Sequence, residues 1–279
     1  MEAGGHACTG AVAGALSSSA IGAATGAELG AAGTAVGALL GAGAALLPDL
    51  DADGATAYRS GGPLTAFVGE AFQRLARTAY GATRLPHDPA GDGEHRGLVH
   101  TPVFAVGLGL LVGLGALLTP WVTTLVLVLV LAPGISALSR SGPRWVRRRL
   151  KTHRDAGAML TAVLITAALF VSGAMDELGW YAGASVAIGM IVHSIGDSAT
   201  RSGIPWSWPL RRRCPKCRPS AQCRGSRWRR SHVLPESLRW RVGSRSGKRI
   251  ERTIEVACLV ALVLLILPDV VGLFVPATT

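Results

Sequence analysis

The sequence TPVFAVGLGLLVGLGALLTPWVTTLVLVLVLAPGISAL, residues 101–138, carries the strongest structural signal in this 279-residue chain. Its two apolar runs, 102–118 and 121–138, are separated only by Thr119 and Pro120. Each run approaches the roughly 17–25 residues that a helix needs to cross a hydrocarbon core of about 30 Å. Proline ends a helix but is tolerated at the first position of the next one. The stretch therefore predicts a transmembrane helical hairpin that turns at Thr119-Pro120.

Further apolar runs extend this pattern to much of the chain. Residues 157–174, 179–196 and 254–271 are each long enough to be a transmembrane helix. The segment from Cys8 to Leu47 is built mainly from alanine and glycine and predicts two thinner helices with Glu28 at their turn. Hydrophobic residues make up 49% of the sequence. We expect an all-α, polytopic transmembrane bundle of about five to seven helices.

The basic residues indicate how the bundle is oriented. The formal net charge is +11, and seven of the 28 basic residues lie between Arg140 and Arg154 while sixteen lie between Arg201 and Arg252. Both clusters flank apolar runs, and lysine and arginine accumulate in cytoplasmic loops. With these two loops in the cytoplasm, the helical hairpins return residues 49–101 and the N-terminal end to the same side. The sequence predicts a multi-pass protein of the plasma or inner membrane.

The segment LLPDLD, residues 46–51, is the first of three polar motifs beside an apolar run. Pro48 ends the preceding helix, and Asp49 and Asp51 follow it two residues apart. Carboxylates with this spacing in an irregular loop can bind one cation. The alternative is a polar loop at a helix end, because aspartate is common in turns.

The second motif, HRGLVHTP, occupies residues 95–102 and precedes the hairpin. Thr101 and Pro102 are typical of an N-cap and a first helical residue. His95 and His100 lie just before this helix, in a loop that can turn both imidazoles inward. Arg96 could offer a forked donor to a phosphate. The alternative is two surface histidines and a surface arginine.

The third motif is HSIGDSATRSGIPWSWP, residues 193–209, at the end of an apolar run. His193 and Asp197 are four residues apart and therefore lie on one face of a helix. Ionisable groups at the edge of a hydrocarbon core are costly unless they are paired or bind a metal ion. We therefore favour metal ligation over a histidine that only packs in the core.

The ordered set of motifs resembles the YdjM-type family of membrane-bound metal-dependent hydrolases, and the resemblance covers nearly the whole chain. It implies a hydrolase with a fold distantly similar to the helical fold of zinc-dependent phospholipase C and single-strand nucleases, and thus phosphoester chemistry. One departure is His100-Thr101, where the family usually has His-Ser. The family motif residues fall in this sequence on His6, Asp49, Asp51, His95, His100, His193 and Asp197.

The residue types suggest a mechanism for such a hydrolase. A mixed set of histidine and aspartate ligands suits zinc, with manganese as the alternative. A bound water molecule with a lowered pKa would attack the phosphoester. Asp51 is the candidate general base, and Arg96 would stabilise developing negative charge. A site at the membrane face favours a lipid or lipid-linked phosphoester as the substrate.

A cysteine cluster predicts a second, structural zinc site. Cys214, Cys217 and Cys223, with His232 further on, begin as a C-x-x-C motif, although the later spacings are not those of a standard zinc finger. The alternative is three reduced thiols, because disulfides are rare in the cytoplasm.

The motifs and charge clusters divide the chain into three parts. We expect a membrane-embedded catalytic region at 1–200, a basic cytoplasmic loop at 201–253, and a C-terminal transmembrane helix at 254–279. The basic loop would contact membrane lipids through their anionic headgroups, and nucleic acid is a less economical partner for it. A cation transporter or a non-catalytic metal-binding membrane protein is the alternative function. Transport usually places ionisable groups near the bilayer midplane, whereas these motifs lie at helix ends on one side.

Overall fold

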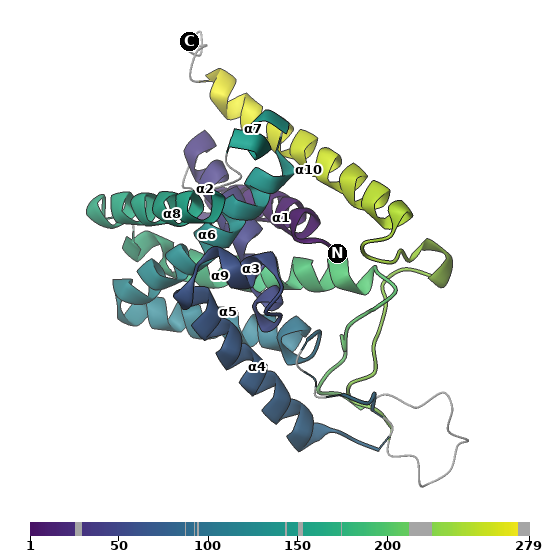
Figure 1. Cartoon of the computed structure of the whole chain (residues 1–279). Helices are drawn as coiled ribbons and strands as arrows, with labels where there is room; N and C mark the ends of the chain where they lie inside the picture. Colours follow the sequence, from purple (N-terminus) through teal and green to yellow (C-terminus); the bar gives the residue numbers. More distant parts are fainter. Residues whose placement is uncertain are drawn as a thin grey trace.

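The computed structural model describes residues 1–25, 30–86, 88–91, 93, 95–142, 144–149, 153–173, 175–211 and 225–272. Within these ranges the chain is helical, with two isolated β-bridges and no sheet (Figure 1). The expected all-α fold is confirmed.

The alanine- and glycine-rich N-terminal segment forms α1 (Ala3–Thr25) and α2 (Gly30–Ala44), as predicted. The two helices approach closely because they face each other with glycines. A Cβ atom at Gly10 would overlap the carbonyl oxygen of Gly41, and one at Gly41 would overlap that of Gly10. Small residues allow this close approach in membrane helices. Glu28, expected at the turn, lies outside the described residues.

The predicted hairpin consists of α5 (Pro102–Leu118) and α6 (Pro120–Ser141). Thr101 caps α5 by accepting a hydrogen bond from the backbone N–H of Phe104 at 3.2 Å. Thr119 caps α6 in the same way, accepting from the N–H of Trp121 at 3.4 Å. The cap at Thr101 and the turn at Thr119-Pro120 are therefore confirmed.

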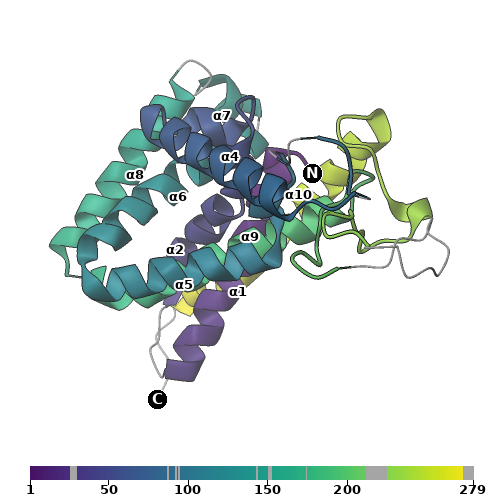
Figure 2. The same ribbon diagram turned by 90° about the horizontal axis from the view of Figure 1, so that it is seen from below.

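A second helical hairpin follows the short helix α7 (Arg144–Arg149). It consists of α8 (Arg154–Val171) and α9 (Met175–Ser198). The apolar run 179–196 lies within α9, and α8 contains the run 157–174 as far as Val171. In Figures 1 and 2, α9 runs alongside α5. The packing sets the C-terminal end of α9 near the start of α5.

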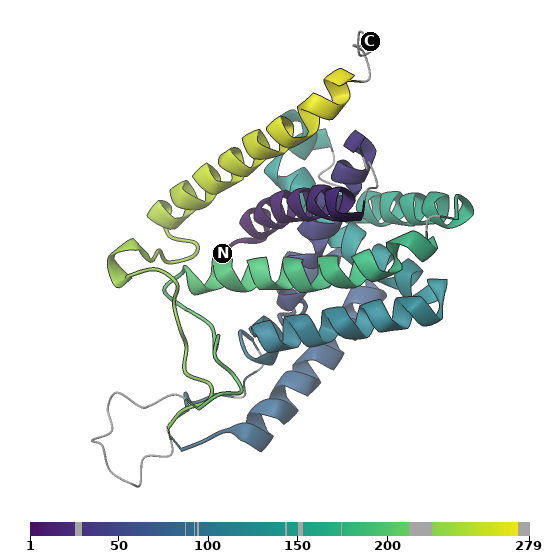
Figure 3. The ribbon, with the colours of Figure 1, turned by 180° about the vertical axis from the view of Figure 1, so that it is seen from behind.

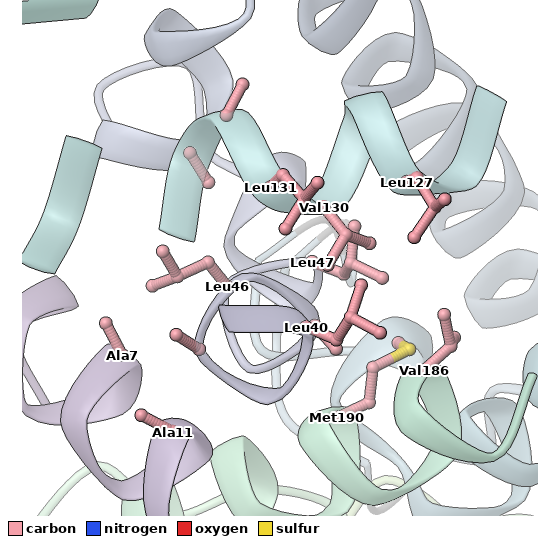
Figure 4. Close-up of a cluster of buried hydrophobic side chains, with 14 of the residues drawn as sticks. Ala7, Ala11, Leu40, Leu46, Leu47, Leu127, Val130, Leu131, Val186 and Met190 are labelled. Carbon is pink, nitrogen blue, oxygen red and sulfur yellow. The ribbon is translucent and has the colours of Figure 1, made fainter. Parts of the chain in front are cut away.

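The apolar core surrounds α2 and the residues that follow it (Figure 4). Leu40 of α2 lies on the side of α6 and α9, and Ala7 and Ala11 of α1 lie on the other side of α2. The residues labelled there are buried: Ala7, Ala11, Leu40, Leu46, Leu47, Leu127, Val130, Leu131, Val186 and Met190. Because Leu46 and Leu47 precede Pro48 directly, this packing fixes the position of the PDLD motif.

Four helical segments in the described part of the chain are long and apolar enough to cross a membrane: Ala3–Ala24, Gly30–Asp51, Pro120–Ser141 and Arg154–Val171. The second of these consists of α2 and the residues that follow it through η1. The apolar helix Pro102–Leu118 is slightly shorter. Its outer face exposes Leu110, Leu111, Leu114 and Leu117, as expected for contact with lipid.

The remaining elements lie around the ends of the bundle. The PDLD motif forms the 3-10 helix η1 (Pro48–Asp51), followed by α3 (Thr56–Ser60) and α4 (Pro63–Thr83). A second 3-10 helix, η2 (Leu98–His100), precedes α5. Residues 201–211 and 225–244, with η3 (Glu236–Leu238), project beside the N-terminal end of α1 and the C-terminal end of α9 (Figure 3). The chain then forms α10 (Arg245–Gly272).

Candidate metal centre

All seven histidine and aspartate residues predicted as metal ligands meet at one end of the bundle. His6 lies in α1, and the two aspartates lie in η1 because Pro48 interrupts the chain after α2. His100 ends η2, and His193 and Asp197 occupy the last turns of α9. Residues separated by up to 191 positions are thereby brought into contact.

Four imidazole rings form a continuous row through the site. The rings of His6 and His193 stack with centroids 3.7 Å apart. His193 and His100 follow at 4.9 Å, and His100 and His95 at 5.4 Å. The row thus brings ring nitrogens from α1, α9, η2 and the loop before η2 together in one place.

Three carboxylates lie along this row. Asp51 Oδ1 is 2.8 Å from His95 Nδ1, and Asp51 Oδ2 is 3.2 Å from His100 Nε2. Asp197 Oδ2 is 3.5 Å from His100 Nδ1 and 3.6 Å from His193 Nε2. Asp49 Oδ1 lies 3.7 Å from His193 Nε2.

These side chains form three overlapping triads, each with one ligand atom per residue and all such atoms within 4.8 Å of one another. The triads are His6–Asp49–His193, His100–His193–Asp197 and Asp51–His95–His100. The middle triad is fully buried, and it shares His193 with the first triad and His100 with the last. The arrangement can accommodate more than one divalent ion.

Unsatisfied polar atoms support this interpretation. Buried groups normally have hydrogen-bond partners, because an unpartnered one costs about 1–3 kcal/mol. Six buried ligand atoms in this cluster have none: His6 Nδ1, Asp51 Oδ2, His100 Nδ1, His100 Nε2, His193 Nε2 and Asp197 Oδ2. They lie close to one another without hydrogen-bond geometry, which is what a shared cation requires of its ligands. The donor set is nitrogen and oxygen, which suits zinc or manganese.

Backbone contacts orient two of the histidines. His193 Nδ1 lies 2.7 Å from the carbonyl oxygen of Ala45, so this nitrogen must carry the proton and Nε2 is left with its lone pair. The Ser194 hydroxyl donates to the His100 carbonyl oxygen at 2.9 Å and ties η2 to α9. Such supporting contacts fix the tautomer and position of metal ligands.

The electrostatics of His100 reflect its two carboxylate neighbours. Burial by itself lowers the pKa of this imidazole, but Asp51 and Asp197 outweigh it and raise the pKa to about 9. In the absence of a metal ion, His100 therefore holds a proton at neutral pH.

Arg96 lies at the edge of the cluster, where it contacts a candidate ligand. Its Nη2 donates to Asp197 Oδ1 at 3.0 Å, and its Nη1 lies 3.4 Å from the Thr200 hydroxyl. Arg96 has a positive φ of 58°, a conformation that costs a non-glycine residue free energy and is often found at functional sites. Its guanidinium thus helps to position Asp197 as well as adding positive charge to the site.

Two contacts near the site have no counterpart in the sequence analysis. The amino group of Met1 lies 2.5 Å from Asp197 Oδ1, so this oxygen has three donors while Oδ2 has none. Asp88 binds the loop around Trp228, 140 residues away, and neither contact has a local sequence signature.

The structure leaves the cysteine prediction untested. Cys214, Cys217 and Cys223 lie outside the described residues. His232 is described, and its Nε2 lies 3.2 Å from the Arg201 carbonyl oxygen.

Comparison with known families now bears on the identity of the chain. A family model described as YdjM inner membrane protein matches residues 1–136 and again residues 131–272. The chain belongs to the YdjM inner membrane protein family. Comparisons with curated proteins and with solved structures found no match. Together with the four candidate spans, membership of this family identifies a multi-pass inner membrane protein.

The two matched regions both contribute to the site. The first contains the candidate ligands up to His100, and the second contains His193 and Asp197. The candidate centre is thus assembled from both halves of this YdjM family protein.

Proposed function

We propose that this protein is a membrane-embedded, metal-dependent hydrolase that cleaves a phosphoester at the cytoplasmic face. The observation that carries the proposal is the set of six unsatisfied ligand atoms buried among four histidines and three aspartates. The motif resemblance described above supports phosphoester chemistry, through a distant relationship to the helical fold of zinc-dependent phospholipase C and single-strand nucleases.

The candidate ligands fit zinc best, with manganese as the alternative. A divalent ion bound there would supply Lewis acidity toward a water molecule and a phosphoryl oxygen. Asp51 and His100 would bind an ion next to the half-exposed His95. His193 and Asp197 would bind an ion at the buried middle triad.

Proton transfer is best assigned to His95 and Asp51 acting together. The Asp51 carboxylate is fully buried, whereas the His95 side chain is 47% exposed and bonds to it at 2.8 Å. A carboxylate that orients an imidazole and stabilises its protonated form is a common acid–base arrangement. Asp51, predicted from the sequence as the base, would therefore act through His95. Arg96, which borders the site, would stabilise negative charge on the phosphoryl group.

A lipid or lipid-linked phosphoester is the proposed substrate class because the site lies at the ends of membrane-spanning helices. The basic loops would help to attract anionic headgroups to this surface.

Elemental analysis of the detergent-purified protein tests the metal site directly. The comparison includes the wild type, a double His193→Ala and Asp197→Ala variant, and a triple Cys214→Ser, Cys217→Ser and Cys223→Ser variant. We expect zinc or manganese to be lost only from the first variant, together with hydrolysis of phosphoesters. A double variant that retains metal and activity would exclude the assignment. Loss of metal only from the cysteine variant would indicate a structural zinc site instead.

A further inference from the structure

A cavity of about 370 Å³ opens beside His95, the most exposed of the candidate metal ligands. Four parts of the chain line it: Tyr80 of α4, the loop that carries His95 and Arg96, Pro205, and the segment with Trp228 and Arg230. Its volume is at the lower end of the range of about 300–1,000 Å³ typical of small-molecule sites. The cavity therefore suits a small ligand group positioned next to the metal centre.

Two arginines, Arg96 and Arg230, line the cavity, and the described lining residues include no carboxylate. Arg96 is already paired with Asp197 at 3.0 Å, so an anion in the cavity would rely mainly on Arg230. Arg230 is exposed, and its one described hydrogen bond runs from Nη1 to the Ser202 carbonyl oxygen at 3.3 Å. An arginine guanidinium has five N–H donors, which leaves Arg230 with donors for an anion.

A larger cavity of about 750 Å³ touches the centre at Asp49, but its charges are different. It is lined by four carboxylates, those of Glu2, Asp49, Glu251 and Glu255. Two of its three cations are already paired, Arg140 with Asp155 and Arg252 with Glu255, each at 2.9 Å. An anionic group would therefore favour the smaller cavity beside His95.

The segment that supplies Arg230 is held firmly against the bundle. Asp88 Oδ1 accepts hydrogen bonds from the Ser226 hydroxyl and from the backbone N–H groups of Arg227 and Trp228 at 2.5–2.9 Å. Trp228 is buried, and its ring packs against Tyr80 with centroids 5.2 Å apart. These contacts fix residues 226–228 as a wall of the cavity.

We infer that this cavity binds the phosphate group of the substrate and that Arg230 is a specificity-determining residue for it. The inference rests on the proposed function for the reaction and adds the substrate class, a compound with an anionic terminal phosphate. Such a group can come from a lipid headgroup or from a soluble phosphomonoester. Trp228 is a positioning residue that holds Arg230 at the cavity.

Binding of inorganic phosphate to the full-length protein in detergent tests the inference by calorimetry. The variants are Arg230→Gln, Arg230→Lys and Lys248→Gln, the last removing a cation of the larger cavity. We expect Arg230→Gln to weaken binding by about tenfold or more, because a charge-assisted hydrogen bond is lost. Arg230→Lys should retain part of the affinity, and Lys248→Gln should bind like the wild type. Equal binding by all variants, or loss only in Lys248→Gln, would overturn the inference.

Two further measurements separate the possible outcomes. Metal content is determined on the same samples. If the wild type contains no metal but binds phosphate through Arg230, the phosphate site in the cavity is supported and the proposed hydrolase function is rejected. Metal present with phosphate binding insensitive to Arg230→Gln would reject the cavity alone. Displacement of phosphate by nanodiscs containing phosphatidic acid, but not by nanodiscs of phosphatidylcholine alone, would identify a lipid headgroup as the source. Displacement by neither would count against a lipid headgroup as the source and leave a soluble phosphomonoester as the substrate class.

Discussion

Asp197 is the residue at which the largest number of polar groups in the site converge. Its Oδ1 accepts from Arg96, His6 and the amino group of Met1, while its Oδ2 faces His100 and His193 without a hydrogen bond. One oxygen is thus fixed by the protein and the other is left for a ligand. This division of roles is typical of a carboxylate that is positioned in advance for a metal ion.

The raised pKa of His100 predicts how metal uptake depends on pH. Burial lowers this pKa, but Asp51 and Asp197 raise it to about 9, so a metal ion must displace a proton at neutral pH. We expect zinc affinity to increase by up to about tenfold per pH unit between pH 7 and 9. Competition with a chromophoric chelator at several pH values measures this, and an affinity independent of pH would contradict the prediction.

The same pKa predicts the stability of the metal-free protein. Because the folded-state pKa lies above the ordinary value of 6.5, the protonated His100 stabilises the fold fully below pH 6.5, and this contribution is lost as the pH rises to about 9. We therefore expect the thermal stability of chelator-treated protein to fall over this interval. A His100→Gln variant cannot bind the proton and should show a much smaller decrease. If the thermal stability of the wild-type protein did not decrease over this interval, His100 would not hold a proton at neutral pH.

At the level of elements, glycines determine how closely the central helices pack. Gly43, in the last turn of α2, faces α6, and a Cβ atom there would overlap the carbonyl oxygen of Val130. Because α2 leads into η1, this contact also fixes the positions of Asp49 and Asp51 relative to the other candidate ligands. A change in the contact should affect both stability and the site.

We predict that Gly43→Ala destabilises the bundle by about 1–3 kcal/mol, as overpacking does in cores. Gly107→Ala is the matched control, because Gly107 also lies in an apolar helix but has no neighbour within 4 Å of an added Cβ atom. Unfolding by titration with a denaturing detergent measures both variants. Equal stability of the two variants would show that the contact between α2 and α6 is not tight.

A second prediction concerns the segment around Trp228, which Asp88 holds in place as a wall of the cavity beside His95. Asp88→Ala leaves the buried N–H group of Trp228 without a partner, at a cost of about 1–3 kcal/mol, and also removes the acceptor of the part-buried N–H group of Arg227. We expect trypsin to cleave near residues 227–230 about tenfold faster or more. Asp53→Ala removes an exposed aspartate bonded to Gln73 and should leave cleavage there unchanged. Slow cleavage of the Asp88 variant would show that the segment is held by other contacts.

The sequence predicts the helices of this protein better than it predicts their assembly. Thr101, Thr119 and the prolines after them are local signals, and the helices begin where these residues indicate. The motif residues could be identified as one site because each lies beside an apolar run. The contact of Asp88 with Trp228 joins residues 140 positions apart, and no local pattern encodes it. The cavity beside His95 depends on that contact, so it could not be predicted from the sequence.

At the scale of the whole molecule, the ends of the hairpins determine which side of the membrane carries the site. The N-terminal end of α1 and the C-terminal end of α9 lie on the side from which the segment between α9 and α10 projects (Figure 3). The turn at residues 172–173, which follows α8, lies at the other end of α9. Because the basic clusters 140–154 and 201–252 flank this hairpin, the charge rule assigns both to the cytoplasm.

This topology predicts opposite results for two reporter fusions. A reporter that is active only outside the cytoplasm should be active when it is fused after Gly173 and inactive when it is fused after Arg211. A fluorescent reporter that matures only in the cytoplasm should give the reverse pattern and controls for expression. Activity outside the cytoplasm at Arg211 would place the metal centre on the outer face, since Arg211 follows α9 on the side that carries His193 and Asp197. The proposed substrate would then have to be a phosphoester of the outer leaflet, and the basic loops would face away from the anionic cytoplasmic lipids that they are expected to bind.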